Sequence, residues 1–146
     1  MDTKGLDVGR IKRNVLEYWQ AESWNWPVKV ISARRAGALK AAAGRVVPVR
    51  GYITSAKFVL GRPLDQVESI LGLVPGDLAA GAALLRLNRL PAAGEFELRG
   101  YTQTPAGEPY AGGAYPPGQG ANQWELFADI PATVLELVSP GQRLSV

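Results

Sequence analysis

The spacing of apolar residues predicts two amphipathic helices. In residues 7–22 apolar side chains recur every three or four positions, which is the period of a helix that packs one face on a core. Residues 61–71 repeat this pattern, with Pro63 where a first helical turn tolerates proline and Gly72 where a helix ends. The alanine-rich residues 34–44 form either a third helix or a flexible basic segment. The apolar positions are Val8, Ile11, Val15, Tyr18 and Trp19 in the first helix and Leu64, Val67, Ile70 and Leu71 in the second.

Two short apolar runs between these helices predict β-strands. Residues 28–32 and 46–55 are rich in valine and isoleucine and are bounded by turn residues. In the first strand Lys29 is expected to face solvent. In the second, Arg50 interrupts an apolar run just before Gly51, and we expect it to point inward. A buried arginine needs a carboxylate, a phosphate or carbonyl oxygens as partners.

A β-hairpin is predicted after the second helix. Residues 84–90 and 95–102 alternate apolar and polar positions on either side of a turn at 91–94. Basic side chains on one strand would then face acidic side chains on the other, and such cross-strand pairs help to fix the register. These residues are Arg86 and Arg89 on the first strand and Glu95 and Glu97 on the second.

The last third of the chain predicts a long loop followed by strands. Residues 102–121 are rich in glycine and proline, and irregular segments of this length in a small domain often have a functional role. Strands are expected at 123–127 and 133–138, with a turn at 129–131 between them. Together these elements predict an α+β fold, a single small domain with an N-terminal helix, a twisted and mainly antiparallel sheet, and a second short helix.

Composition narrows the chemistry. The 146 residues suit one domain, which we divide into a helical, basic part over residues 1–45 and a strand-rich candidate catalytic core over residues 46–146. The chain contains no cysteine and no histidine, which removes thiolate nucleophiles, histidine-dependent catalysis and the usual zinc ligands. We therefore predict no metal. No apolar run approaches the roughly 20 residues that span a bilayer, and residues 1–13 lack the apolar core of a secretory signal.

Charge is distributed unevenly along the chain. Residues 1–62 hold twelve basic and four acidic side chains, whereas residues 63–146 hold four basic and nine acidic ones. A basic half beside an acidic half suggests a site for an anion, such as nucleic acid or nucleotide phosphates. The alternative is that the two halves pair with each other.

Three of the four tryptophans lie close together before the first strand. Trp19, Trp24 and Trp26 fall within eight positions, and we expect them to anchor the N-terminal helix on the sheet. The alternative is a stacking platform for a nucleobase or a nicotinamide ring.

The order of polar residues in the strand-rich part resembles a known family. Arg50 lies on an early core strand, Tyr101-Thr102-Gln103-Thr104 ends a later one, and Gln123-Trp124-Glu125 leads into the last strands. This order resembles the three-part pattern of ADP-ribosyltransferase-type toxin domains, in which an arginine, an aromatic-Ser-Thr-Ser strand and a Gln/Glu-x-Glu element form the site. Here the Ser-Thr-Ser element is replaced by Thr-Gln-Thr.

The resemblance implies roles for these residues. Glu125, Gln123 and Arg50 would be catalytic, and NAD would be bound as substrate by Arg50, Tyr52, Thr102, Thr104, Tyr110 and Tyr115. A fixed carboxylate can stabilise the oxocarbenium-like state that forms when the nicotinamide–ribose bond breaks, and this needs neither histidine nor metal. The outcome would be ADP-ribosyl transfer or NAD hydrolysis. The alternative is that Glu125 is a rim residue and Arg50 its ion-pair partner.

The loop over residues 104–117 resembles the glycine- and proline-rich region of NAD-glycohydrolase toxins, and the whole domain is similar to the C-terminal effector domains of bacterial polymorphic toxins. That resemblance implies delivery by a specialised secretion system, action in the target-cell cytoplasm, a cognate immunity protein, and a protein or nucleic acid as acceptor. We expect no membrane partner.

Two other function classes remain open. A metal-independent ribonuclease toxin would bind RNA phosphates with the basic half and move a proton with Glu125 or a tyrosine. A non-enzymatic module would instead grip a protein partner with its tryptophan cluster and its tyrosine-containing loop.

Overall fold

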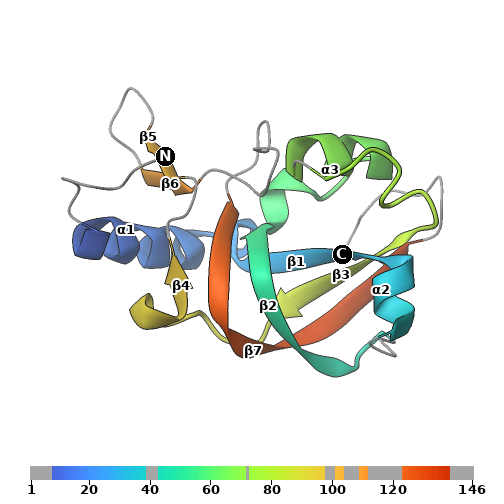
Figure 1. Cartoon of the computed structure of the whole chain (residues 1–146). Helices are drawn as coiled ribbons and strands as arrows, with labels where there is room; N and C mark the ends of the chain where they lie inside the picture. The colour runs from blue at the N-terminus through green and yellow to red at the C-terminus, as the bar shows by residue number, and fades with distance from the viewer. Residues whose placement is uncertain are drawn as a thin grey trace.

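Four antiparallel strands close into a small barrel. The computed structural model describes residues 8–38, 43–71, 73–97, 101–103, 109–111 and 123–138. Strands β1 (Pro27–Ser32) and β7 (Gln123–Val138) each pair with both β2 (Val46–Ser55) and β3 (Ala82–Leu87), which closes the circuit, and β4 (Phe96–Glu97) extends the sheet beside β7 (Figure 1). The prediction of a single small α+β domain with an antiparallel sheet is confirmed.

Helices pack around this barrel. The α-helices are α1 (Val8–Ala21), α2 (Ala33–Ala38) and α3 (Leu64–Leu71). Both predicted amphipathic helices are thus confirmed, and the short helix α2 overlaps the start of the alanine-rich segment. The shorter elements are the 3₁₀ turns η1 (Ser23–Asn25), η2 (Ala56–Phe58) and η3 (Ala93–Glu95) and the paired strands β5 (Tyr101–Gln103) and β6 (Pro109–Ala111).

The main core joins the barrel to α1 through aromatic side chains. Trp19 of α1 is fully buried and lies with its ring centroid 5.1 Å from that of Trp124 on β7 and 5.1 Å from that of Phe96 on β4. Each such ring removes roughly 150–250 Å² from water, so this contact holds α1 in place. Trp19 is the anchor that the sequence predicted. Trp24 is 54% exposed, so the prediction is wrong for that residue.

A second core lies between α3 and the outer faces of β1 and β3. Val28 of β1 and Leu84 of β3 point outward and pack with Val67 of α3, while Ile31 and Leu85 belong to the main core. This division follows from the strand period of two, because successive side chains project to opposite faces. The sheet therefore carries an apolar layer on both sides of β1 and β3.

A buried glutamate shapes the chain beyond α3. Glu68 is only 7% exposed, and its two carboxylate oxygens accept hydrogen bonds from the amides of Gly76 at 3.0 Å and Leu78 at 2.7 Å. The amide of Leu73 donates to the carbonyl oxygen of Glu68 at 2.9 Å. These bonds turn the loop back onto α3 and hold Leu73 beside β1.

The predicted hairpin is wrong in its pairing. Strands β3 and β4 both form, but each pairs with β7, which lies between them. The ion pair between Arg89 and Glu95, 2.7 Å from Nη1 to Oε1, spans the intervening turn rather than two strands. Arg86 instead lies over the ring of Trp26 at 4.6 Å. Local alternation identified the strands, but their partner comes from far along the sequence.

The predicted turn at 129–131 is also wrong, because β7 runs unbroken from 123 to 138. Pro131 lies opposite Pro48 of β2 within the paired region. Its carbonyl oxygen accepts a hydrogen bond from the amide of Asn88 at 2.8 Å, a bond that needs no amide hydrogen from proline itself. A proline at this position is therefore compatible with a continuous strand.

Candidate functional site

A slot opens in the barrel where β1 and β2 part. The two strands are paired only at Pro27↔Ser55 and Val28↔Thr54. Beyond this point β1 continues along β3, whereas β2 continues along β7. In the same region the pairing of β2 with β7 shifts register between Val49 and Gly51, and Gly51 has a positive φ of 83°, so β2 departs from regular strand geometry. The two strands therefore leave a gap in the barrel wall.

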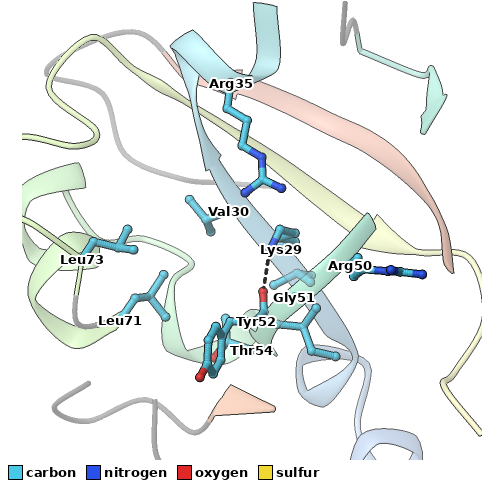
Figure 2. A pocket seen from close by; sticks show the side chains of 11 residues that line it. Lys29, Val30, Arg35, Arg50, Gly51, Tyr52, Thr54, Leu71 and Leu73 are labelled. Carbon is cyan, nitrogen blue, oxygen red and sulfur yellow. Dashed lines mark hydrogen bonds between the residues drawn. The ribbon is translucent and has the colours of Figure 1, made fainter. Parts of the chain in front are cut away.

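A pocket of about 260 Å³ occupies this slot. Val30 of β1 and the side chains of Leu71 and Leu73 form an apolar wall (Figure 2). Tyr52 and Thr54 of β2 line the opposite side. The pocket is thus mostly apolar, with its polar groups restricted to a few positions, as is typical of sites for small molecules.

Lys29 forms the charged floor of the pocket. It is 7% exposed, and its Nζ donates a hydrogen bond to the carbonyl oxygen of Tyr52 at 2.8 Å (Figure 2). The Tyr52 carbonyl faces the slot, where the main chain of β1 has moved away. A Cβ added to Gly51 would lie 3.6 Å from the same Nζ, so the lysine amine lies directly beside the backbone of Gly51.

The prediction that Lys29 faces solvent is wrong. Lys29 is paired with Leu85 of β3 and lies on the same face of β1 as Ile31, both of which contribute to the main core. Its long side chain carries the amine into the slot rather than leaving it among apolar groups. The correct orientation follows from the alternation along β1, which outweighs the polarity of the residue.

Burial and, to a smaller extent, the positive charge of Arg35 together lower the pKa of Lys29 from 10.5 to about 8. Arg35 extends from α2 toward Lys29 at the edge of the pocket (Figure 2). With a pKa near 8, about one Lys29 side chain in ten is neutral at pH 7 and about half are neutral at pH 8. The sequence alone gave no sign that Arg35, in a basic alanine-rich segment, would meet Lys29.

Arg50 does not point inward as predicted. Its side chain is 60% exposed, points away from the centre of the pocket, and pairs with Asp129 of β7, 3.2 Å from Nε to Oδ1 (Figure 2). The orientation follows from the alternation along β2, because Val47, Val49 and Ile53 face the main core and Arg50 lies between two core-facing positions. The predicted pairing of Arg50 with Glu125 is replaced by the pair with Asp129.

Glu125 lies one strand away from the pocket. It is the cross-strand partner of Tyr52, so the two residues share a face of the sheet. The residue is half-buried, with its Oε1 atom covered. Thus the structure places the predicted catalytic carboxylate beside the strand that carries Tyr52, without placing it among the residues that line the pocket.

The other predicted site residues are described only in part. Thr102 and Tyr110 are cross-strand partners in β5 and β6, and Gln123 is paired with Thr54 at the start of β7. The structure describes the backbone of Thr102, Tyr110 and Gln123 but not their side chains. Thr104 and Tyr115 lie wholly outside the described residues.

The described part of the chain offers neither a cluster of metal ligands nor a membrane-spanning helix. It contains no group of three or more acidic side chains placed to hold a metal ion. None of its helices is long and apolar enough to cross a membrane. Comparisons with family models, curated proteins and solved structures found no match to the chain.

Proposed function

We propose that this domain binds a small organic anion in the slot between β1 and β2. The observation that carries the proposal is the charge of the pocket. Lys29 and Arg35 converge on it, and none of the described residues that line it is acidic. Two cations directed toward one another at the pocket repel each other, and an anion bound beside both removes that repulsion.

The energy available to an anion is substantial. A unit charge about 4 Å from a cation at an effective dielectric constant of about 20 gains on the order of 4 kcal/mol before desolvation is subtracted. A carboxylate or phosphate can also accept two hydrogen bonds from one guanidinium group. Arg35 is therefore suited to hold the acidic group, while Lys29 contacts it from the floor.

The size of the pocket favours a small ligand. Its volume of about 260 Å³ lies just below the range of about 300–1,000 Å³ that is usual for sites of larger organic ligands. Val30, Leu71 and Leu73 would cover an alkyl or ring portion of the molecule. A ligand with one acidic group and a short apolar body fits these features best.

Titration calorimetry tests this proposal with lactate, inorganic phosphate and uncharged lactamide. We expect at least one of the anions to bind and lactamide to bind far more weakly. Arg35→Gln should weaken anion binding by about tenfold or more. The matched control is Arg34→Gln, which removes the neighbouring exposed arginine outside the pocket lining.

The pH dependence gives a second readout. Anion affinity should fall as the pH rises through about 8, where Lys29 loses its charge, and Lys29→Met should remove this dependence. Equal affinities for lactate and lactamide, or equal losses from Arg34→Gln and Arg35→Gln, would contradict the proposal.

An NAD-cleaving activity is the second candidate. It is favoured by one observation, namely that Arg50 and Tyr52 line the pocket and Glu125 lies opposite Tyr52 on β7. The pocket would hold only part of an NAD molecule, with the scissile bond directed toward Glu125. Export by a specialised system and an immunity protein stay predictions that depend on this activity.

An NAD-consumption assay tests the second candidate, with Glu125→Gln as the variant and Glu17→Gln on the exposed side of α1 as its control. Activity that survives Glu125→Gln would exclude the proposed role of this carboxylate. Cleavage of RNA without NAD would instead favour the ribonuclease alternative.

A further inference from the structure

We propose that Lys29 forms an imine with a small 2-oxo acid held in the slot, an inference that rests on the anion binding proposed above. The carboxylate of such a molecule would contact Arg35 and its carbonyl carbon would face the Lys29 amine. The apolar wall would cover the remaining carbon atoms.

The geometry around the Lys29 amine suits a nucleophile. Its Nζ is held by the 2.8 Å hydrogen bond to the Tyr52 carbonyl oxygen and lines the pocket. A neutral amine can donate one hydrogen in this bond and still present its lone pair to a ligand. Gly51 lies directly beside the nitrogen, since a Cβ at this position would be 3.6 Å from Nζ. Because glycine has no side chain, the nitrogen stays uncovered on this side.

The protonation of Lys29 also favours this reaction. Burial and the charge of Arg35 lower its pKa to about 8, so the neutral fraction at pH 7 is roughly 300-fold larger than for a lysine with a pKa of 10.5. Lysines that form imines in enzymes are commonly activated in this way, by desolvation in an apolar pocket or by a neighbouring cation. Both causes act on Lys29.

The reaction consists of addition followed by loss of water. The amine lone pair attacks the carbonyl carbon, the nitrogen gives up a proton, and the carbonyl oxygen takes one up to form a carbinolamine. The carbon–oxygen bond then breaks, a carbon–nitrogen double bond forms, and one water molecule leaves for each imine. Solvent at the mouth of the slot exchanges the protons, so no histidine is required.

A structural role for Lys29 gives a different expectation. If the lysine only bridges the gap to the Tyr52 carbonyl, it should react no faster than other lysines of the chain. Lys12 and Lys57 serve as internal references, because their amines lie over the rings of Phe96 and Tyr18 at 5.2 Å and 4.6 Å.

Reductive trapping with pyruvate and sodium borohydride tests the proposal on the full chain. We expect peptide mapping by mass spectrometry to find one reduced pyruvate adduct, on Lys29. Lys29→Arg should abolish the adduct and Arg35→Gln should reduce its yield about tenfold at low pyruvate, whereas Arg34→Gln should leave it unchanged. At saturating pyruvate the initial rate should rise with pH through a midpoint above 8, because the bound carboxylate favours the charged form of Lys29.

Lactate separates this proposal from the one on which it rests, because it differs from pyruvate in carrying a hydroxyl instead of a carbonyl group. Lactate binding without an adduct on Lys29 would overturn the imine and leave anion binding intact. Failure of both would overturn both. Adducts distributed evenly over Lys12, Lys29 and Lys57 would also overturn the imine, and this result needs no variant to fold.

Discussion

Lys29 and Glu68 are buried to the same extent, each 7% exposed, yet they are held in opposite ways. Glu68 has both oxygens engaged by main-chain amides, so its charge is compensated within the fold. Lys29 has one hydrogen bond, to the Tyr52 carbonyl, and otherwise faces a pocket and a second cation. A buried charged group whose hydrogen bonds are all made within the protein supports the fold. A buried charged group that can still form further hydrogen bonds is available to a ligand.

The largest expected effect on stability comes from removing the Glu68 carboxylate. Glu68→Ala removes two charge-assisted hydrogen bonds and leaves the amides of Gly76 and Leu78 without their acceptor. We expect the free energy of unfolding to fall by about 4 kcal/mol. Urea denaturation measures it, with the exposed Glu17→Ala as control. A loss below about 1 kcal/mol would show that Glu68 does not hold the loop.

The contribution of Lys29 to the free energy of unfolding should depend on pH. The pKa of Lys29 is about 8 in the folded state and near 10.5 in the unfolded state. Between these values the unfolded chain binds more protons, so this group makes stability rise with pH, by about 3 kcal/mol in total. Relative to Lys29→Met, the wild type should gain that amount between pH 8 and 10.5 in urea denaturation. Parallel pH profiles of the two proteins would contradict the lowered pKa.

Gly51→Ala tests how closely the slot is fitted to the lysine. A positive φ of 83° costs an alanine about 1–2 kcal/mol. Gly61 has a similar φ of 76°, but a Cβ added there meets nothing within 4 Å. Gly61→Ala therefore gives the backbone cost alone. Because a Cβ on residue 51 would be in ordinary van der Waals contact with Lys29 Nζ, at 3.6 Å, thermal unfolding should show about equal losses for the two variants, and a clearly larger loss for Gly51→Ala would mean that the slot is fitted closely around the lysine.

The smallest effect is expected at the surface pair. Asp129→Asn breaks the contact with Arg50, in which both side chains are about 60% exposed. Exposed pairs of this kind contribute at most about 1 kcal/mol, so we expect a change in unfolding free energy near 0.5 kcal/mol or less. Urea denaturation at low and high salt measures it. A loss above about 1 kcal/mol would show that this pair supports the bulge in β7, where residues 127–129 lie opposite Arg50.

The elements were largely predictable from the sequence, whereas their partners were not. Helix α1 and strand β2 lie where their apolar periodicity predicts, because these signals are local. The pairing of β3 and β4 with β7 depends on residues 123–138, and no local pattern carries that information. A nearby turn and alternating charges therefore suggested a hairpin that does not form.

The candidate site was the least predictable part. Lys29 was assigned to solvent because of its polarity, although the alternation with Ile31 places it on the core face of β1. The burial of Glu68 depends on a loop that returns from residues 73–78. Arg50 was misplaced although the alternation with the core residues Val49 and Ile53 places it on the outer face of β2.

Strand β7 also determines when the barrel can form. It supplies partners to β2, β3 and β4, so until residues 123–138 have been synthesised β2 and β3 each lack one neighbour. The remaining pairs, β1 with β2 and β1 with β3, leave two open sheet edges on the emerging chain. Contacts so distant in sequence slow folding, and the barrel closes only after its last strand has left the ribosome.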